Sequence, residues 1–296
     1  MSDRDAFLAA IHDAPDDDAP RLVFADWLEE NGQSERAELI RIQIKMHRER
    51  EQNARVTLRL AKLFLRQKAL FSLPWADSAR RCGANLLGTH SRGFPDRMTM
   101  SAQEFAAAGL DVVEWIGPRT HIRLHECAGM MERVASQISL RYVRSLSISQ
   151  LGEHPHTDAD VAAFLRSPYL SGLMELHIAP WMSLQGEIPA PLTSEVARSI
   201  AAAPSITRLH TLSVSDIRIG VDGFAALTGA TNLASLRVLV VGVYGLGEFA
   251  MGPLLAEHRL SGLESFVVTG EVTQAVYDRL TECFGKGVIR ARVFDR

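Results

Sequence analysis

Histidine and cysteine have the side chains with the widest range of chemistry. Along the sequence they first occur close together at His121, His125 and Cys127. Both groups are ligands that zinc accepts. The apolar pattern around them predicts a strand, however, and residues four apart on a strand lie roughly 13 Å from each other. A single Zn²⁺ takes its ligand atoms at about 2 Å, so His121 and His125 alone do not close a metal site. We expect these histidines to be solvated.

A denser cluster follows, with two histidines and two aspartates at His154, His156, Asp158 and Asp160. Mixed sets of imidazole and carboxylate groups bind divalent metals. The alternative is a turn that leads into a helix, because acidic residues favour a helix N-terminus. Thr157 and Asp160 also have the spacing of a capping box. A metal-dependent protein centred on residues 154–160 therefore stays open as an alternative to a purely structural role.

No catalytic motif accompanies these residues. The sequence contains no G-x-x-x-x-G-K-[ST], no G-x-S-x-G and no H-E-x-x-H. Its cysteines, Cys82, Cys127 and Cys283, are far apart and lie in no nucleophile motif. Such a sparse, odd set indicates free thiols in a reducing compartment. We expect a protein that is not an enzyme and that uses no cofactor.

Composition indicates a folded, soluble protein. The 296 residues are 47% hydrophobic and 23% charged, with a net charge of −3, which is ordinary for globular proteins and allows two domains. The acidic N-terminus does not fit a signal peptide, and no apolar stretch is long enough to span a membrane. We expect a cytoplasmic protein with no membrane partner.

Charge is unevenly distributed along the first third of the chain. Residues 1–34 carry nine acidic side chains against two arginines, whereas residues 41–81 carry eleven basic side chains against three acidic ones. A basic helix can contact phosphate groups, so a nucleic-acid-associated protein is an alternative. The stretch lacks the interleaved exposed aromatics that stack on single strands. We favour basic side chains that are solvated or that neutralise the acidic region.

Four segments of the first 43 residues stand out: FLAAI at 7–11, PDDD at 15–18, RLVFADWLEENG at 21–32 and ERAELIRIQ at 35–43. This series resembles the bacterial repeat-companion domain, a short N-terminal module commonly placed ahead of leucine-rich repeats. The resemblance implies architecture and no activity. It agrees with apolar spacing that predicts helices over about 20–30 and from 34 onward, the first ended by Asn31-Gly32. We expect a core position for Trp27 and an ion-pair network of Asp26, Arg36 and Glu38.

An apolar frame, L-x-x-L-x-L, recurs in the later part of the chain. Its five clear copies begin at Val143, Leu173, Leu209, Leu236 and Leu263, and Arg119 begins a degenerate earlier copy. The central leucines are 30, 36, 27 and 27 residues apart, which leaves room for a helix after each strand. We expect such helices over 158–166, 193–203, 222–227 and 248–257. A further helix at 272–283 and a strand at 288–294 are expected to form a C-terminal cap.

The frame resembles leucine-rich repeats of the ribonuclease-inhibitor type. The predicted fold is therefore α/β: a small helical domain over residues 1–82, then an irregular solenoid over 83–296 with parallel strands on its concave face and helices on its convex face. The asparagine or cysteine usual after the strand is replaced by Leu151, Trp181, Ile217, Tyr244 and Glu271. We therefore expect an irregular solenoid with little curvature.

Strand side chains alternate between two faces, so the residues between the leucines should share the concave face. They are His121, Arg123, His125, Ser145, Ser147, Ser149, Glu175, His177, Thr211, Ser213 and Ser215, followed by Val238, Val240, Ser265, Val267 and Thr269. A broad polar surface of this kind suits a protein or peptide. We therefore predict a non-catalytic recognition or scaffold protein that binds another protein there. The alternative is that short polar residues merely keep an exposed sheet soluble.

Overall fold

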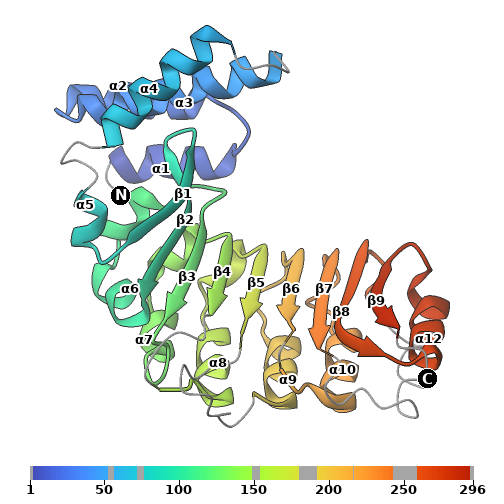
Figure 1. Ribbon diagram of the computed structural model, residues 1–296. Helices are drawn as coiled ribbons and strands as arrows, with labels where there is room; N and C mark the ends of the chain where they lie inside the picture. Colours follow the sequence, from blue (N-terminus) through green and yellow to red (C-terminus); the bar gives the residue numbers. More distant parts are fainter. Residues whose placement is uncertain are drawn as a thin grey trace. The chain divides into compact units, whose positions relative to one another are not determined.

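The computed structural model describes residues 3–52, 57–71, 77–148, 154–179, 192–215, 217–242 and 259–293. The chain is mixed α/β with a mostly parallel sheet (Figure 1). It divides into two compact units: unit 1 comprises Met1–Met100 and Ala107–Ile122, and unit 2 comprises Ser101–Ala106 and Arg123–Arg296. The predicted domain boundary, between residues 82 and 83, falls inside unit 1. That residues 1–82 and 83–296 are separate domains stays a prediction.

Unit 1 begins with helices and continues into a β-hairpin. The elements are α1 (Asp3–Asp13), α2 (Ala19–Glu30), α3 (Ser34–Gln52), α4 (Leu58–Phe71), α5 (Asp77–Arg81), β1 (Asn85–Ser91), β2 (Phe94–Ser101) and a 3-10 helix at Asp111–Trp115. The helices expected over 20–30 and from 34 are present. Gly32 follows α2 with a φ of +77°, a conformation that glycine adopts at little cost. Strands β1 and β2 pair antiparallel.

A buried arginine lies in the core of unit 1. The guanidinium of Arg36 stands 4.7 Å from the ring centre of Trp115 and 5.6 Å from that of Phe24. One of its nitrogens lies 3.3 Å from a carboxylate oxygen of Glu114. Phe24 and Trp115 are fully buried, whereas Trp27 is only half-buried and stacks on Phe24. The core position expected for Trp27 therefore belongs to Phe24.

The expected ion-pair network in unit 1 has different members from those predicted. Asp26, Arg36 and Glu38 do not pair with one another. Each pairs instead with a residue later in the chain, because the helices bring other elements against them. The pairs are Asp26–Arg41 at 2.6 Å, Glu38–Arg66 at 2.6 Å and Arg36–Glu114 at 3.3 Å.

Unit 2 alternates strands and helices. Strand β3 (His121–His125) crosses the division between the units, and α6 (Ala102–Ala108) does so too. The remaining elements are α7 (Met131–Ala135), β4 (Ser145–Ile148), α8 (Asp158–Leu165), β5 (Glu175–Ile178), α9 (Ser194–Ala202), β6 (Thr211–Val214), α10 (Gly220–Gly229), β7 (Val238–Gly242), β8 (Ser265–Val272), α12 (Gln274–Phe284) and β9 (Ile289–Val293), with 3-10 helices at Ile138–Tyr142 and Leu170–Gly172.

Strands β4 to β9 pair in chain order, and every neighbouring pair is parallel. The helices predicted at 158–166, 193–203 and 222–227 are confirmed as α8, α9 and α10, and the predicted terminal helix and strand as α12 and β9. The helix predicted over 248–257 lies outside the described residues. Helices α8, α9 and α10 pack side by side in one row (Figure 1).

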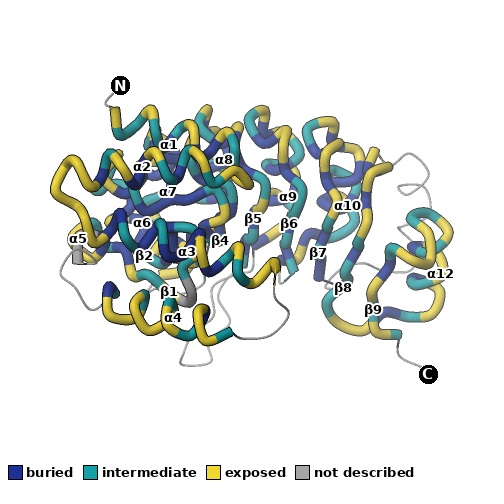
Figure 2. Tube along the Cα trace, turned by 90° about the horizontal axis from the view of Figure 1, so that it is seen from above, coloured by how far each residue is buried: buried dark blue, intermediate teal, exposed yellow. Residues whose placement is uncertain are grey.

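All fifteen apolar residues of the five clear frame copies are buried. Their central positions lie opposite one another in the sheet, as Leu146, Leu176, Leu212, Leu239, Phe266 and finally Ile289 of β9. Six residues before each central residue of β4 to β8 lies another buried apolar residue. These residues are Leu140, Leu170, Ile206, Leu233 and Leu260. Figure 2 shows buried stretches along the strands of unit 2 and on parts of its helices. Each buried leucine contributes about 1.5–3 kcal/mol.

A repeated hydrogen-bond pattern joins successive copies of the frame. The carbonyl of Arg144 accepts from the N–H groups of Met174 and Glu175 at 2.8 and 2.9 Å. The carbonyls of Met174, His210 and Arg237 each accept in the same way from the next copy. We call this series the shared-carbonyl ladder. Because one oxygen accepts two successive N–H groups, it fixes where the following strand begins.

A substitution of Gly93, in the β1–β2 turn, tests how closely this turn packs against α3. Its φ is +96°, and an added Cβ would lie 2.4 Å from Cγ1 of Ile40. We expect Gly93→Ala to lower the free energy of unfolding by about 2–4 kcal/mol, from backbone strain and overpacking together. Gly32→Ala is the matched control, because Gly32 also has a positive φ but has nothing within 4 Å of the added Cβ. Urea unfolding of both variants measures the difference, and equal losses would contradict the packing argument.

Candidate protein-binding face

One face of the unit 2 sheet carries the residues that alternate with the buried leucines. We call it the open face. Its central row, in strand register, is Ser147, His177, Ser213, Val240, Val267 and Arg290. A parallel row is Ser145, Glu175, Thr211, Val238 and Ser265. Most of these side chains are half-buried, as expected for short side chains on a sheet whose other face is packed.

The structure brings most of the predicted face residues together. Ser147, His177 and Ser213 are direct neighbours across β4, β5 and β6. At the start of the series, Arg123 and His125 belong to the unit 2 part of β3, whereas His121 belongs to unit 1. Ser215 follows the end of β6 and is half-buried, and Ser149 lies outside the described residues.

The polar end of the open face contains a tethered carboxylate. The Ser145 hydroxyl donates a 2.7 Å hydrogen bond to Oε2 of Glu175. Next to it, burial lowers the pKa of the His177 imidazole below its usual 6.5, and the negative charge of Glu175 only partly opposes this. His177 is therefore neutral at pH 7, able both to donate and to accept a hydrogen bond. The neutral imidazole and the tethered carboxylate therefore offer directional hydrogen bonds at this end of the face.

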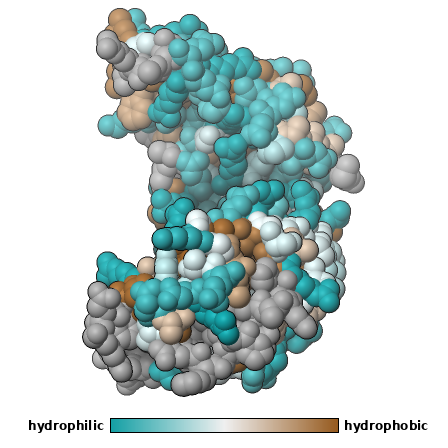
Figure 3. Space-filling view, turned by 90° about the vertical axis from the view of Figure 1, so that its right-hand side faces the viewer, coloured by the Kyte–Doolittle hydropathy of each residue, from teal (hydrophilic) through white to brown (hydrophobic). Residues whose placement is uncertain are grey.

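The open face becomes apolar and then basic along the sheet. Val238, Val240 and Val267 are half-buried on β7 and β8. Thr269 turns its hydroxyl inward, to the carbonyls of Ser215 at 3.1 Å and Val241 at 3.2 Å. The molecule seen from the side where β9 lies is mostly hydrophilic, with small separate apolar patches (Figure 3). Binding at this face would therefore combine a short apolar stretch with polar groups on either side.

Two arginines of β9 were missed in the predicted set. Arg290 lies opposite Val267 in the central row, and Arg292 lies opposite Glu271. Both are exposed. The sequence contained a signal for them. The strand at 288–294 was predicted, and within it the two arginines alternate with Ile289, Ala291 and Val293, which places the arginines on one face. The list of face residues ended one strand too early.

The cluster at 154–160 stabilises helix ends. Asp160 accepts from the N–H of Thr157 at 2.9 Å and from that of Gly129 at 2.8 Å, and the predicted capping box is confirmed. Asp158 accepts from the N–H of Thr193 at 2.9 Å and from its hydroxyl at 2.5 Å. The carboxylates that a metal would need already hold α7, α8 and α9 together. This supports the structural interpretation.

His156 of the same cluster is enclosed in the protein. Its side chain is buried and hydrogen-bonds the backbone of Ala179, and burial lowers the pKa of its imidazole. His154, by contrast, is exposed. The two histidines therefore occupy different environments, and the negative charge of Asp160 acts on His156, where it partly opposes the effect of burial on the pKa.

Basic residues of α3 and α4 pair with acidic residues of unit 1. Four arginines of the basic stretch contact carboxylates within 4 Å, in the pairs Arg41–Asp26, Arg48–Asp18, Arg59–Glu49 and Arg66–Glu38. Two of these carboxylates, Asp18 and Asp26, come from the acidic region 1–34, so their pairs join sequence regions of opposite charge. This supports neutralisation inside unit 1. Contact with nucleic acid stays an untested prediction.

Comparison with known proteins gives no family for this chain. No protein-family model matches it, and a search of curated proteins finds no match. Within the part of the chain that the structure describes, no helix is long and apolar enough to cross a membrane. The interpretation of the open face therefore depends on its own geometry.

The pKa of His177 gives a pH test of this site. The folded imidazole binds fewer protons than the unfolded one below pH 6.5, so its contribution to stability is lost as pH falls below that value. We expect Glu175→Gln to lower the pKa of His177 further, because the opposing negative charge is removed. Histidine NMR titration, assigned with a His177→Gln variant, measures it, with Glu282→Gln on α12 as control. A pKa of His177 above 6.5 would contradict the burial argument.

Proposed function

We propose that this protein is a non-catalytic recognition protein whose open face binds a segment of another protein. One observation carries the proposal: a register-matched row of half-buried side chains runs across five strands, from Ser147 on β4 to Val267 on β8. The exposed Arg290 of β9 ends this row. Ser147, Ser213 and Val240 are short and leave room above the sheet for a ligand.

The proposed architecture is an irregular leucine-rich-repeat solenoid preceded by a module of the repeat-companion type. Support comes from the burial of the five frame copies and from the parallel pairing of β4 to β9. In a stack of this kind each copy buries its apolar side against the next. The open face is then the concave face, and the row of α8, α9 and α10 is the convex side.

The dimensions of the open face favour an extended segment over a globular partner. Six strands spaced about 4.8 Å apart span roughly 24 Å, and strands of four or five residues are about 13–16 Å long. The flat area is therefore roughly 300–400 Å², less than half of the about 800 Å² per partner of a standard interface. A polypeptide of about seven extended residues spans 24 Å. We infer that such a segment crosses the strands.

The cysteines and the lack of a catalytic motif fit this role. No disulfide joins Cys82, Cys127 and Cys283, which agrees with a reducing compartment such as the cytoplasm. The proposed protein works as a scaffold or sensor there, without a cofactor.

A peptide-display selection on the full chain tests the proposal. We expect the chain to enrich related peptides, and Ser147→Glu with Ser213→Glu to weaken their binding at least tenfold, because the added carboxylates fill the row and must be desolvated. Fluorescence polarisation of a selected peptide measures the affinity.

The matched control is Ser136→Glu with Ser261→Glu, two exposed serines of unit 2 outside the open face. This variant should bind as the original chain does. Circular dichroism establishes that both double variants are folded. Selected peptides that bind the open-face variant undiminished would move the binding site elsewhere and overturn the proposal.

A further inference from the structure

A small pocket in unit 1 is lined by three arginines. Arg21, Arg92 and Arg119 surround a cavity of about 30 Å³, together with His47 and Thr120. Asp96 is the one acidic residue in its lining. A single water needs about 10–15 Å³, so the cavity holds about two water-sized groups and is partly open to solvent. A small polar ligand fits it.

Arg21 presents an unused donor in this pocket. Its side chain is 3% exposed. The two terminal nitrogens donate to the carbonyls of Asp17 at 2.6 Å and Pro15 at 2.8 Å. Its Nε–H has no hydrogen-bond partner within the described residues. A buried donor without an acceptor is unfavourable, and a bound oxyanion would supply the acceptor.

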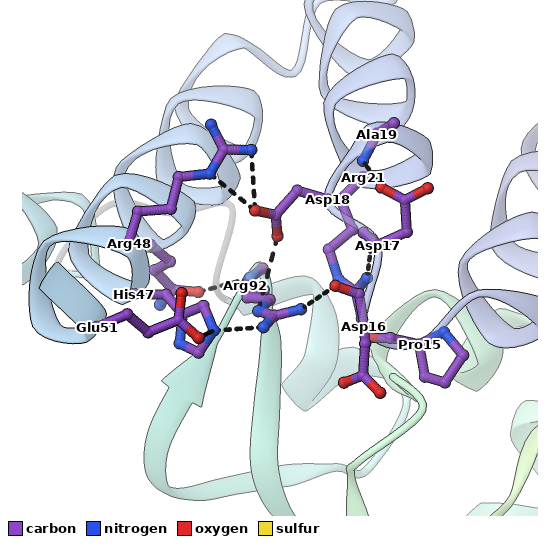
Figure 4. A network of polar contacts seen from close by, with 12 residues as sticks. Pro15, Asp16, Asp17, Asp18, Ala19, Arg21, His47, Arg48, Glu51 and Arg92 are labelled. Atoms are coloured by element: carbon purple, nitrogen blue, oxygen red, sulfur yellow. Dashed lines mark hydrogen bonds and ion pairs between the residues drawn. The ribbon is translucent and has the colours of Figure 1, made fainter.

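Arg92 occupies a backbone position that arginine rarely adopts. Its φ is +50° in the turn between β1 and β2, where asparagine followed by glycine is preferred. Its guanidinium donates to the carbonyl of Asp16 at 2.9 Å and contacts Nε2 of His47. Figure 4 shows this side chain among Asp16, Asp18 and His47. The backbone strain is kept for the placement of the guanidinium, as at many binding sites.

The nearby carboxylates are already engaged. Asp18 accepts from Arg48 at 3.0 Å, and Asp16 accepts from Arg119 at 2.5 Å (Figure 4 shows Asp18 between Arg48 and Arg92). Burial, together with the positive charges of Arg92 and Arg119, lowers the pKa of Arg21 to about 10, and the negative charges of Asp18 and Asp16 oppose this shift only in part. Arg92 and Arg119 each pair with one of these carboxylates, at 3.7 Å to Asp18 and 2.5 Å to Asp16, so the donor that stays without an acceptor is the Nε–H of Arg21.

We propose that this pocket binds a phosphate group through Arg21, Arg92 and Arg119. Arginine guanidinium groups match the oxygens of phosphate in geometry and charge. The phosphate group is either a free ion or part of a phosphomonoester. A cavity of about 30 Å³ encloses about two of its oxygens, and the rest of the group lies at the open side of the pocket. This site is independent of the open face.

Thermal unfolding of the full chain in sodium phosphate tests the site, against sodium chloride and sodium acetate at equal ionic strength and pH. A ligand that binds the folded state raises the melting temperature with concentration. We expect the melting temperature to rise with phosphate concentration and to be lower in chloride and in acetate than in phosphate. An equal rise in acetate, or no rise in phosphate, would overturn the proposal.

Two variants locate the effect. Arg92→Asn keeps a residue suited to the turn and removes the guanidinium, and Arg119→Gln changes an exposed residue at the rim. We expect each to need at least tenfold more phosphate for the same rise. Arg50→Gln, an exposed arginine of α3 outside the pocket, is the control and should respond like the original chain. An equal response from all the variants would show diffuse binding to basic helices and reject the pocket.

O-phosphoserine, compared with inorganic phosphate, identifies the source of the group. Tighter binding of the phosphomonoester assigns the site to a phosphorylated ligand, and tighter binding of inorganic phosphate assigns it to the free ion. If Arg92→Asn does not unfold cooperatively, Arg119→Gln alone decides, because its side chain is largely exposed.

Discussion

The shared-carbonyl ladder is the constraint on which the rest of unit 2 depends. Each of its oxygens accepts two consecutive N–H groups of the next copy, so the next strand has one possible starting point. A slip by one residue would turn every leucine toward the open face and every serine toward the helices. The apolar series and the open face are therefore two results of one backbone register.

Side chains extend this register to the helices. Asp158 and Asp160 bind groups of the neighbouring copies at Thr193 and Gly129. The spacing between the central apolar residues ranges from 27 to 36 residues, yet the strands stay aligned, because the ladder fixes the start of each following strand. Around α8 the two aspartates add a second link to the copies on either side.

The strands that follow the repeated apolar frame could be predicted from the sequence. Contacts between residues far apart in the sequence could not. The frame predicted β4 to β8, because burial demands apolar residues at fixed spacing. It also gave the register that unites Ser147, His177 and Ser213. The pairing of Arg36 depends on Glu114, which is 78 residues away, and no local pattern points to it. The choice of Phe24 over Trp27 for the core likewise depends on which helix faces are covered. At the open face, the low pKa of His177 arises from burial, which spacing alone does not supply.

The ladder uses backbone atoms, so the residues that form it need not share a side-chain type. Arg144, Met174, His210, Arg237 and Glu264 occupy equivalent places, although they share neither charge nor size. Two successive intervals are also both 27 residues long. The side chains at these junctions can therefore differ from copy to copy while the strands keep the same register, so chemical variety along the edge of the sheet costs the fold nothing in backbone hydrogen bonds.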